Sequence, residues 1–358
     1  MRQIASWAGC WSFAVILGCM ICGWVTMAAA GASSAGELLA DATPVADLSH
    51  APDKQYESRI GALKTRFDMS FGSRHDNFNW SIAGDASGSN PNIISELDWS
   101  KVEAYQMRLG NRTQVGKWLY FRGQFQYAWI QDGSVRDSDY RSDNRGDEYS
   151  RSISDSSGDQ LWDLSFGAGY PFILAKGSLR IAPLLGFSIS KQNFRITNGY
   201  QVIGTGPPET PDLGPLDSRL NSTYRAKWIG PWIGCDLRYQ IEPKRPGQIP
   251  MELGASLELH WAAYSGQGNW NLRGDLQHPV SFEHQADGFG IRIEVEWLIR
   301  FAPNWDLSLA ADYLNWSTDH GVNTQYGTSG TNVSRLNEVE WEARSFMVGV
   351  TYYFFGKR

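Results

Sequence analysis

The sequence predicts an all-β fold, a transmembrane antiparallel up-and-down β-barrel of about ten strands. Apolar and polar residues alternate in many segments after residue 60, most clearly in 289–299. There Phe289, Ile291, Ile293, Val295, Trp297 and Ile299 alternate with residues that include Arg292, Glu294 and Glu296. Successive side chains of a strand point to opposite faces. The pattern recurs behind an apolar leader, between connectors of alternating length, so we expect the apolar face to contact lipid.

Residues 1–35 are predicted to be a signal peptide. Arg2 is followed by an apolar run that contains Phe13 and Leu17, and small residues follow at 28–30 and 33–35. A basic start, an apolar stretch and small residues in this order are typical of a secretory leader. An uncleaved helical anchor is the alternative, because the apolar stretch is long enough to span a bilayer. Residues 36–59 are polar and lack a period, which predicts a periplasmic N-terminal tail before a barrel over 60–358.

Composition excludes several classes of protein. Three of the four cysteines lie in the leader, and only Cys235 follows it. The mature chain therefore has no internal disulfide or cysteine-based metal site, and we expect neither a metal nor a cofactor. A formal net charge of −6 does not suggest a nucleic-acid partner. No segment after the leader is apolar enough for a membrane helix, so strands must cross the membrane.

The predicted strands cover ten segments after the leader. They are 60–72, 93–108, 116–132, 159–172, 177–196, 222–240, 250–264, 285–300, 304–316 and 341–355. Short connectors lie near 110–116, 172–176, 242–249 and 300–304, and long ones cover 73–92, 133–158, 197–221, 265–284 and 317–340. Short periplasmic turns and long surface loops are typical of outer-membrane barrels, so we expect the protein to be located in the cell outer membrane of a bacterium.

The lumen of such a barrel is expected to be narrow and filled. Barrel diameter grows with strand number, and ten strands are close to the number at which side chains fill the interior. The inward charged residues predict ion pairs and water in the lumen; they are Arg122, Glu252, Glu258, Arg292, Glu294, Glu296 and Asp306. Outward Trp129, Trp261 and Trp297 suit aromatic belts at the membrane interfaces. A filled barrel acts through its rim or loops.

Several segments resemble a known family. Residues 95–99 (SELDW), 133–140 (GSVRDSDY) and 224–234 (YRAKWIGPWIG) are similar to segments of omptins, the ten-stranded outer-membrane proteases. The acidic run that begins at Asp137 and leads to 163–170 (DLSFGAGY) looks closer to the omptin-related Protochlamydia-type outer-membrane proteins. The resemblance extends in order over nearly the whole mature chain, and it implies an omptin-like barrel.

The omptin resemblance implies a proteolytic site at the rim, where an acidic pair activates water and an Asp-x-His couple supplies a general base. Asp137 and Asp139 match the acidic pair. In the loop that should carry the couple, Asp275 and His278 are three residues apart instead of two, which in an extended segment places them on opposite faces. A turn could restore the geometry. We therefore expect a non-proteolytic surface barrel. The alternatives are an endopeptidase that uses these four residues and a narrow selective channel.

The resemblance also implies partners at the membrane surface. Omptins bind lipopolysaccharide through basic residues on neighbouring outer strands, and Lys191 and Lys227 lie where those cations would be, with Arg195 nearby. The alternative is that these cations extend to the membrane edge without a specific ligand. Expected partners are outer-membrane lipid, lipopolysaccharide and, during insertion, the barrel-assembly machinery.

Overall fold

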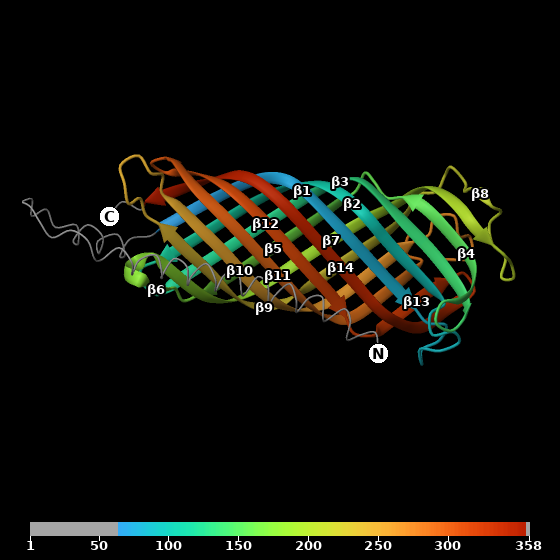
Figure 1. Ribbon diagram of the computed structural model, residues 1–358. Coiled ribbons are helices and arrows are strands. Elements are labelled where there is room, and N and C mark those ends of the chain that lie inside the picture. The colour runs from blue at the N-terminus through green and yellow to red at the C-terminus, as the bar shows by residue number, and fades with distance from the viewer. Residues whose placement is uncertain (1–63, 356–358) are drawn as a thin grey trace, which may run out of the picture. The chain divides into compact units, whose positions relative to one another are not determined.

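A computed structural model describes residues 64–355, and its strands form one antiparallel sheet (Figure 1). The elements are β1 (Lys64–Ile82), β2 (Ser95–Val115), β3 (Leu119–Ser142), β4 (Gly146–Asp155), β5 (Gln160–Gly169), β6 (Phe172–Leu174), the 3-10 turn η1 (Ala175–Gly177), β7 (Leu179–Gly204), β8 (Gly214–Pro215), β9 (Ser222–Ile241), β10 (Met251–Asn269), β11 (Phe282–Ala302), β12 (Trp305–Thr318), β13 (Gly321–Gly327) and β14 (Gly330–Phe355). None of the helical segments within these residues could cross a membrane. The predicted leader and tail lie outside the described residues.

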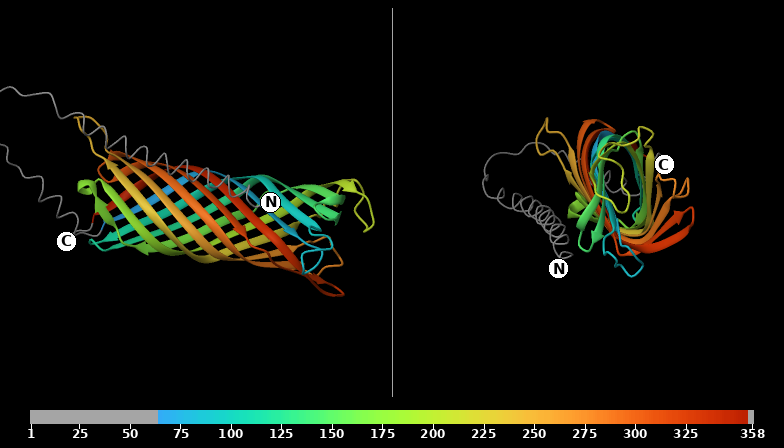
Figure 2. Two further views of the ribbon diagram at one scale, coloured as in Figure 1. Left: turned by 60° about the horizontal axis from the view of Figure 1, so that its bottom comes forward. Right: turned by 90° about the vertical axis from the view of Figure 1, so that its right-hand side faces the viewer.

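The sheet closes into a ring because β1 pairs with β14 (Figure 2, right). Ten strands form the ring, as the sequence predicts. The fourth ring position is shared: β5 pairs with the first half of β3 and β4 with its second half. At the ninth position, β13 continues β12 after a short break at 319–320. The start of β1 and the end of β14 lie at the rim of short turns, which is the periplasmic rim in outer-membrane barrels.

The alternation of each strand separates a lipid face from a lumen face. In the β10–β11 pair, Ser256 lies opposite Glu294 and Leu257 lies opposite Ile293. Glu294 is 3% exposed, whereas Leu257 is 44% exposed. The outward positions of Trp129, Trp261 and Trp297 are also confirmed, at 41%, 47% and 41% exposure. Charged residues therefore line the interior, and apolar residues cover the outside.

Two of the predicted long loops are strands instead. Within 133–158, β3 continues to Ser142 and β4 begins at Gly146; within 317–340, β13 and β14 leave only residues 328–329 between them. Asn144 and Arg145 both have φ of 59°, as tight hairpin turns require. Past the lipid band the outward side chains become polar, so the alternation that marks a spanning strand is lost while backbone pairing continues. The long connectors that remain are 83–94, 205–221 and 270–281.

The interior consists of two parts with different chemistry. We call the periplasmic part the ionic half; its buried charged residues are Arg66, Asp68, Arg74, Asp76, Arg108, Arg112, Arg122, Asp163, Asp236, Arg238, Glu252, Glu258, Arg292, Glu294, Glu296, Asp306 and Asp312. We call the extracellular part the aromatic half; its buried rings are Phe78, Trp80, Trp99, Phe194, Tyr224, Trp228, Tyr264, Phe282, Trp316 and Trp341. On β1 the change occurs between Asp76 and Phe78.

The ion pairs predicted for the lumen are present in the ionic half, whereas packed rings fill the aromatic half instead. The predicted water stays a prediction. Trp80, Trp99 and Trp228 are at most 3% exposed, and they face inward. Alternation identifies which residues share a face, but it does not show which face is the lumen when both faces carry rings. Inward rings are stable here because they pack against one another and exclude water.

Candidate functional site

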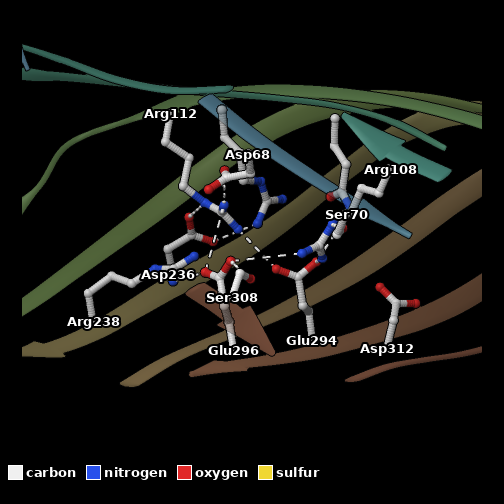
Figure 3. A network of polar contacts seen from close by, with 12 residues as sticks. Asp68, Ser70, Arg108, Arg112, Asp236, Arg238, Glu294, Glu296, Ser308 and Asp312 are labelled. Carbon is white, nitrogen blue, oxygen red and sulfur yellow. Dashed lines mark hydrogen bonds and ion pairs between the residues drawn. The ribbon is translucent and has the colours of Figure 1, made fainter. Parts of the chain in front are cut away.

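Carboxylates join arginines from opposite sides of the ring in the ionic half (Figure 3). Glu296 on β11 accepts hydrogen bonds from Arg66 on β1 at 2.7 Å, from Arg238 on β9, and from Ser308. Its neighbour Glu294 accepts from Arg108 at 2.7 Å and from Arg112 at 3.0 Å, both on β2. Buried charges are stable only when they are paired and hydrogen bonded. This network fills the periplasmic half of the lumen.

Ring contacts fill the aromatic half. Trp99 on β2 stacks on Phe194 of β7 with ring centroids 5.1 Å apart, and it lies 5.4 Å from Tyr224 of β9. Trp228 meets Trp316 edge-on at 5.3 Å. These contacts connect strands on opposite sides of the ring, so the interior is a packed core at this level.

Asp137 and Asp139 lie on β3 near the extracellular mouth, and not in a loop as the sequence suggests. They pair with Leu97 and Ser95 on β2. Leu97 belongs to the buried core, so both aspartates face the interior. Trp129 is the last exposed ring on the outer face of β3, and the pair therefore lies beyond the lipid band. The structure brings together the two acids that the resemblance selects.

Burial sets the charge of this acidic pair. Burial and the neighbouring Asp139 carboxyl raise the pKa of Asp137 well above its usual range. Burial also raises the pKa of Asp139, against hydrogen bonds from Ser95 and Ser150 that lower it. The positive charge of Arg273, in the connector 270–281, also acts to lower the pKa of both acids, but burial outweighs it. The pair therefore holds protons more tightly than exposed aspartates do.

Asp275 and His278 are engaged within their own connector. Arg273 donates two hydrogen bonds to Asp275, at 2.8 and 2.7 Å, and lowers the pKa of that carboxyl. The His278 ring contacts Asn269 at 2.8 Å and the Arg273 carbonyl at 3.2 Å. Within residues 64–355 no hydrogen bond or ion pair links either residue to Asp137 or Asp139. Sequence reasoning missed Arg273, although it precedes Asp275 by two residues.

A different histidine faces the interior near the mouth. His284 on β11 is buried, lies 4.8 Å from the Trp80 ring, and has Nδ1 2.9 Å from the Tyr224 hydroxyl. The outward neighbours Gln285 and Asp287 are polar, which places His284 beyond the lipid band. Burial lowers its pKa to about 3, so its imidazole is neutral at physiological pH. No motif in the sequence marks this residue as catalytic.

The cations selected for lipopolysaccharide lie together on the outer surface. Lys191 on β7 pairs directly with Lys227 on β9, and the next outward pairs are Asn193 with Arg225 and Arg195 with Thr223. We call Lys191, Arg195, Arg225 and Lys227 the basic ladder. Sequence reasoning missed Arg225, which alternation places on the same face as Lys227.

The basic ladder begins where the lipid band ends. The outward pair before it, toward the periplasm, is Ile189 with Ile229. The Lys191 ammonium lies 5.2 Å from the centre of the Trp162 ring. Among the described residues, no carboxylate lies within ion-pair distance of these four cations, although the charges of Arg195 and Arg225 oppose the effect of burial, which raises the pKa of the Asp159 carboxyl. Like charges directly opposite each other on paired strands are unfavourable, so this arrangement is suited to an anionic ligand.

Comparison with known proteins agrees with this architecture. The family model for the Protochlamydia outer membrane protein matches residues 68–354. The structure of the outer membrane protease OmpT from Escherichia coli is similar with a TM-score of 0.66 and 15% identity, over 81% of this chain and 97% of that chain. OprG from Pseudomonas aeruginosa has a TM-score of 0.31, with 9% identity over 83% of this chain and 98% of its own. The NalP translocator domain from Neisseria meningitidis has a TM-score of 0.30, with 11% identity over 82% of this chain and 88% of that chain.

At 15% identity the OmpT likeness establishes the fold alone, and the two lower TM-scores carry no argument. Comparison with curated protein sequences gave no match.

Proposed function

We propose that this chain, which belongs to the Protochlamydia outer membrane protein family, is a sealed, non-proteolytic surface barrel that binds phosphorylated lipopolysaccharide head groups at its basic ladder. The family and the fold place the protein in the bacterial outer membrane. There the extracellular connectors are available to ligands outside the cell, and the ladder faces the outer leaflet.

The observation that carries this proposal is the position of the ladder. Lys191 and Lys227 lie directly opposite each other, immediately above the apolar pair Ile189 and Ile229. Phosphates of the outer leaflet lie at this level of a barrel. Phosphate oxygens accept strong charge-assisted hydrogen bonds from lysine and arginine, and they would relieve the repulsion between the facing cations.

The proposal is tested by lipopolysaccharide binding to the purified protein in detergent. Near an anionic surface each lysine contributes about 1 kcal/mol. The double variant Lys191→Gln/Lys227→Gln should therefore bind about thirty-fold more weakly, since 1.4 kcal/mol corresponds to about a factor of ten. Lys117→Gln, in the periplasmic turn, is the matched control and should bind normally. Wild type should bind dephosphorylated lipopolysaccharide weakly, with the same affinity that the double variant has for intact lipopolysaccharide. Equal binding by variant and wild type would refute the proposal.

The second candidate is an endopeptidase, which the inward position of Asp137 and Asp139 at the mouth favours. If it is correct, a peptide with basic residues is cleaved by wild type and not by Asp139→Asn. His278→Ala and His284→Ala then identify the base, because only one of them should abolish cleavage. We expect no cleavage by any of these proteins. Cleavage that depends on Asp139 would overturn the non-proteolytic proposal.

The third candidate, a narrow channel, is disfavoured by the two filled halves of the lumen. We expect no stable current of porin size when the protein is inserted into planar bilayers. Such a current would contradict a sealed barrel. It would not test lipopolysaccharide binding, which the ladder variants test independently.

A further inference from the structure

A small cavity lies between the ionic half and the aromatic half. Its wall includes Asp163 and Ser165 on β5, Ser188 and Ser190 on β7, His260 on β10, Arg292 on β11 and Trp316 on β12. Within it, a volume of about 10 Å³ is open to the centre of a water molecule. This corresponds to room for about one water. Ser190 precedes Lys191 of the basic ladder in the chain, but its side chain is buried in the lumen, whereas Lys191 points outward.

A directed chain of hydrogen bonds leads to this cavity from the ionic half. Arg122 donates to one oxygen of Glu258 at 2.5 Å, and the other oxygen lies 2.9 Å from His260 Nε2. A carboxylate that pairs with arginine is an acceptor, so His260 Nε2 carries a proton and donates to Glu258. The other ring nitrogen, His260 Nδ1, lies at hydrogen-bond distance from the Ser188 hydroxyl, 3.1 Å away. At least one lone pair of Ser188 Oγ remains available for another donor.

On the side of the aromatic half, the wall contains polar groups without partners. Trp316 Nε1 and Ser165 Oγ are buried, and neither has a hydrogen-bond partner among the described residues. An unpaired buried donor loses its bonds to water on folding without replacement, which destabilises the fold. Groups of this kind are usually satisfied by internal water.

We propose that this cavity binds one ordered water molecule, which accepts from the Trp316 indole N–H and donates to the oxygens of Ser188 and Ser165. The chain Trp316–water–Ser188–His260–Glu258–Arg122 then connects the two halves of the lumen. A water supplies both the acceptor and the donors that the wall needs. An anion does not fit, because it cannot donate to Ser188 and because the Asp163 carboxylate, which accepts from Arg74 at 2.7 Å, forms part of the wall. The Arg292 guanidinium also lies in the wall, but it is already paired with the Asp312 carboxylate at 2.6 Å.

The test is a crystal structure of the unmodified protein at a resolution that reveals ordered water. We expect one peak within about 3.2 Å of both Trp316 Nε1 and Ser188 Oγ. Trp316→Phe should remove the peak, whereas Trp297→Phe, on the lipid face, should leave it unchanged. An empty cavity in the unmodified protein would overturn the proposal. So would an anomalous signal in the cavity after a bromide soak, since it would identify the ligand as a halide.

Discussion

The two halves of the lumen are both closed, but different interactions close them. In the ionic half, Glu296 and Glu294 hold arginines that come from the other side of the ring. In the aromatic half, Phe78 lies among Trp99, Phe194 and Tyr224 with ring centroids 5.2–5.8 Å apart. A truncated side chain therefore leaves an unpaired charge in the first half and an empty volume in the second.

This difference shows that a barrel interior does not have to be polar. Inward residues must satisfy each other because water is excluded, and pairs of opposite charges or packed rings can do so. The two solutions respond differently to substitution, and the substitutions below compare them in order of expected effect.

Glu296→Gln should have the largest effect, because it keeps the shape of the side chain and removes a charge that Arg66 and Arg238 share. Breaking a buried ion pair from one side costs about 3–5 kcal/mol. The free energy of unfolding by urea in lipid vesicles measures this loss. Glu103→Gln, whose side chain is 60% exposed, should change it by less than about 0.5 kcal/mol. A loss below about 1 kcal/mol at Glu296 would show that the ionic half contributes little to stability.

Phe78→Ala should cost about 3 kcal/mol, since it leaves a cavity in the aromatic half. Phe78 is fully buried, so the loss includes both the transfer of the ring and the empty volume. Urea unfolding measures it, and the loss should be the same at low and high salt because no charge is removed. If the loss caused by Phe78→Ala depended strongly on salt, the packing of the aromatic half would be coupled to the ion pairs of the ionic half.

The acidic pair at the mouth should give a smaller effect that depends on pH. Burial raises the pKa of Asp137 and Asp139 in the folded state, so both bind protons more tightly there than in the unfolded chain. Their contribution to stability is complete below the ordinary aspartate pKa of about 3.9 and is lost as pH rises through the folded values. Asp137→Asn/Asp139→Asn should therefore be more stable than wild type at pH 7, with a difference that shrinks toward pH 4. A variant that is less stable at pH 7 would contradict this sign.

The smallest effect is expected for an ion pair on the outer surface. Arg344 donates to Glu342 at 2.5 Å, but the arginine side chain is 71% exposed. Exposed ion pairs contribute about 0–1 kcal/mol, because solvent screens them. Arg344→Gln should change the free energy of unfolding by less than about 0.5 kcal/mol. A change as large as that of Glu296→Gln would mean that burial does not explain the difference between the two ion pairs.

Alternation predicted most of the barrel but not its extracellular end. The ten strands and the outward position of Trp129, Trp261 and Trp297 follow from a period of two. The hairpin extension through Ser142 and Gly146 was missed, because polar residues on both faces carry no alternating signal. Local resemblance located Asp137 and Asp139 but could not show that Arg273 is the connector residue whose charge acts on them.

By itself, the sequence determined which side chains share a face of each strand. In the ionic half it also determined which face meets lipid, since a strand in a membrane must present apolar residues to hydrocarbon. Only the tertiary structure decided which inward residues meet. Arg66 and Glu296 are separated by 230 residues and touch because ring closure leaves only β14 and β12 between β1 and β11. Ring closure and strand stagger set those contacts, and no local spacing in the chain encodes them.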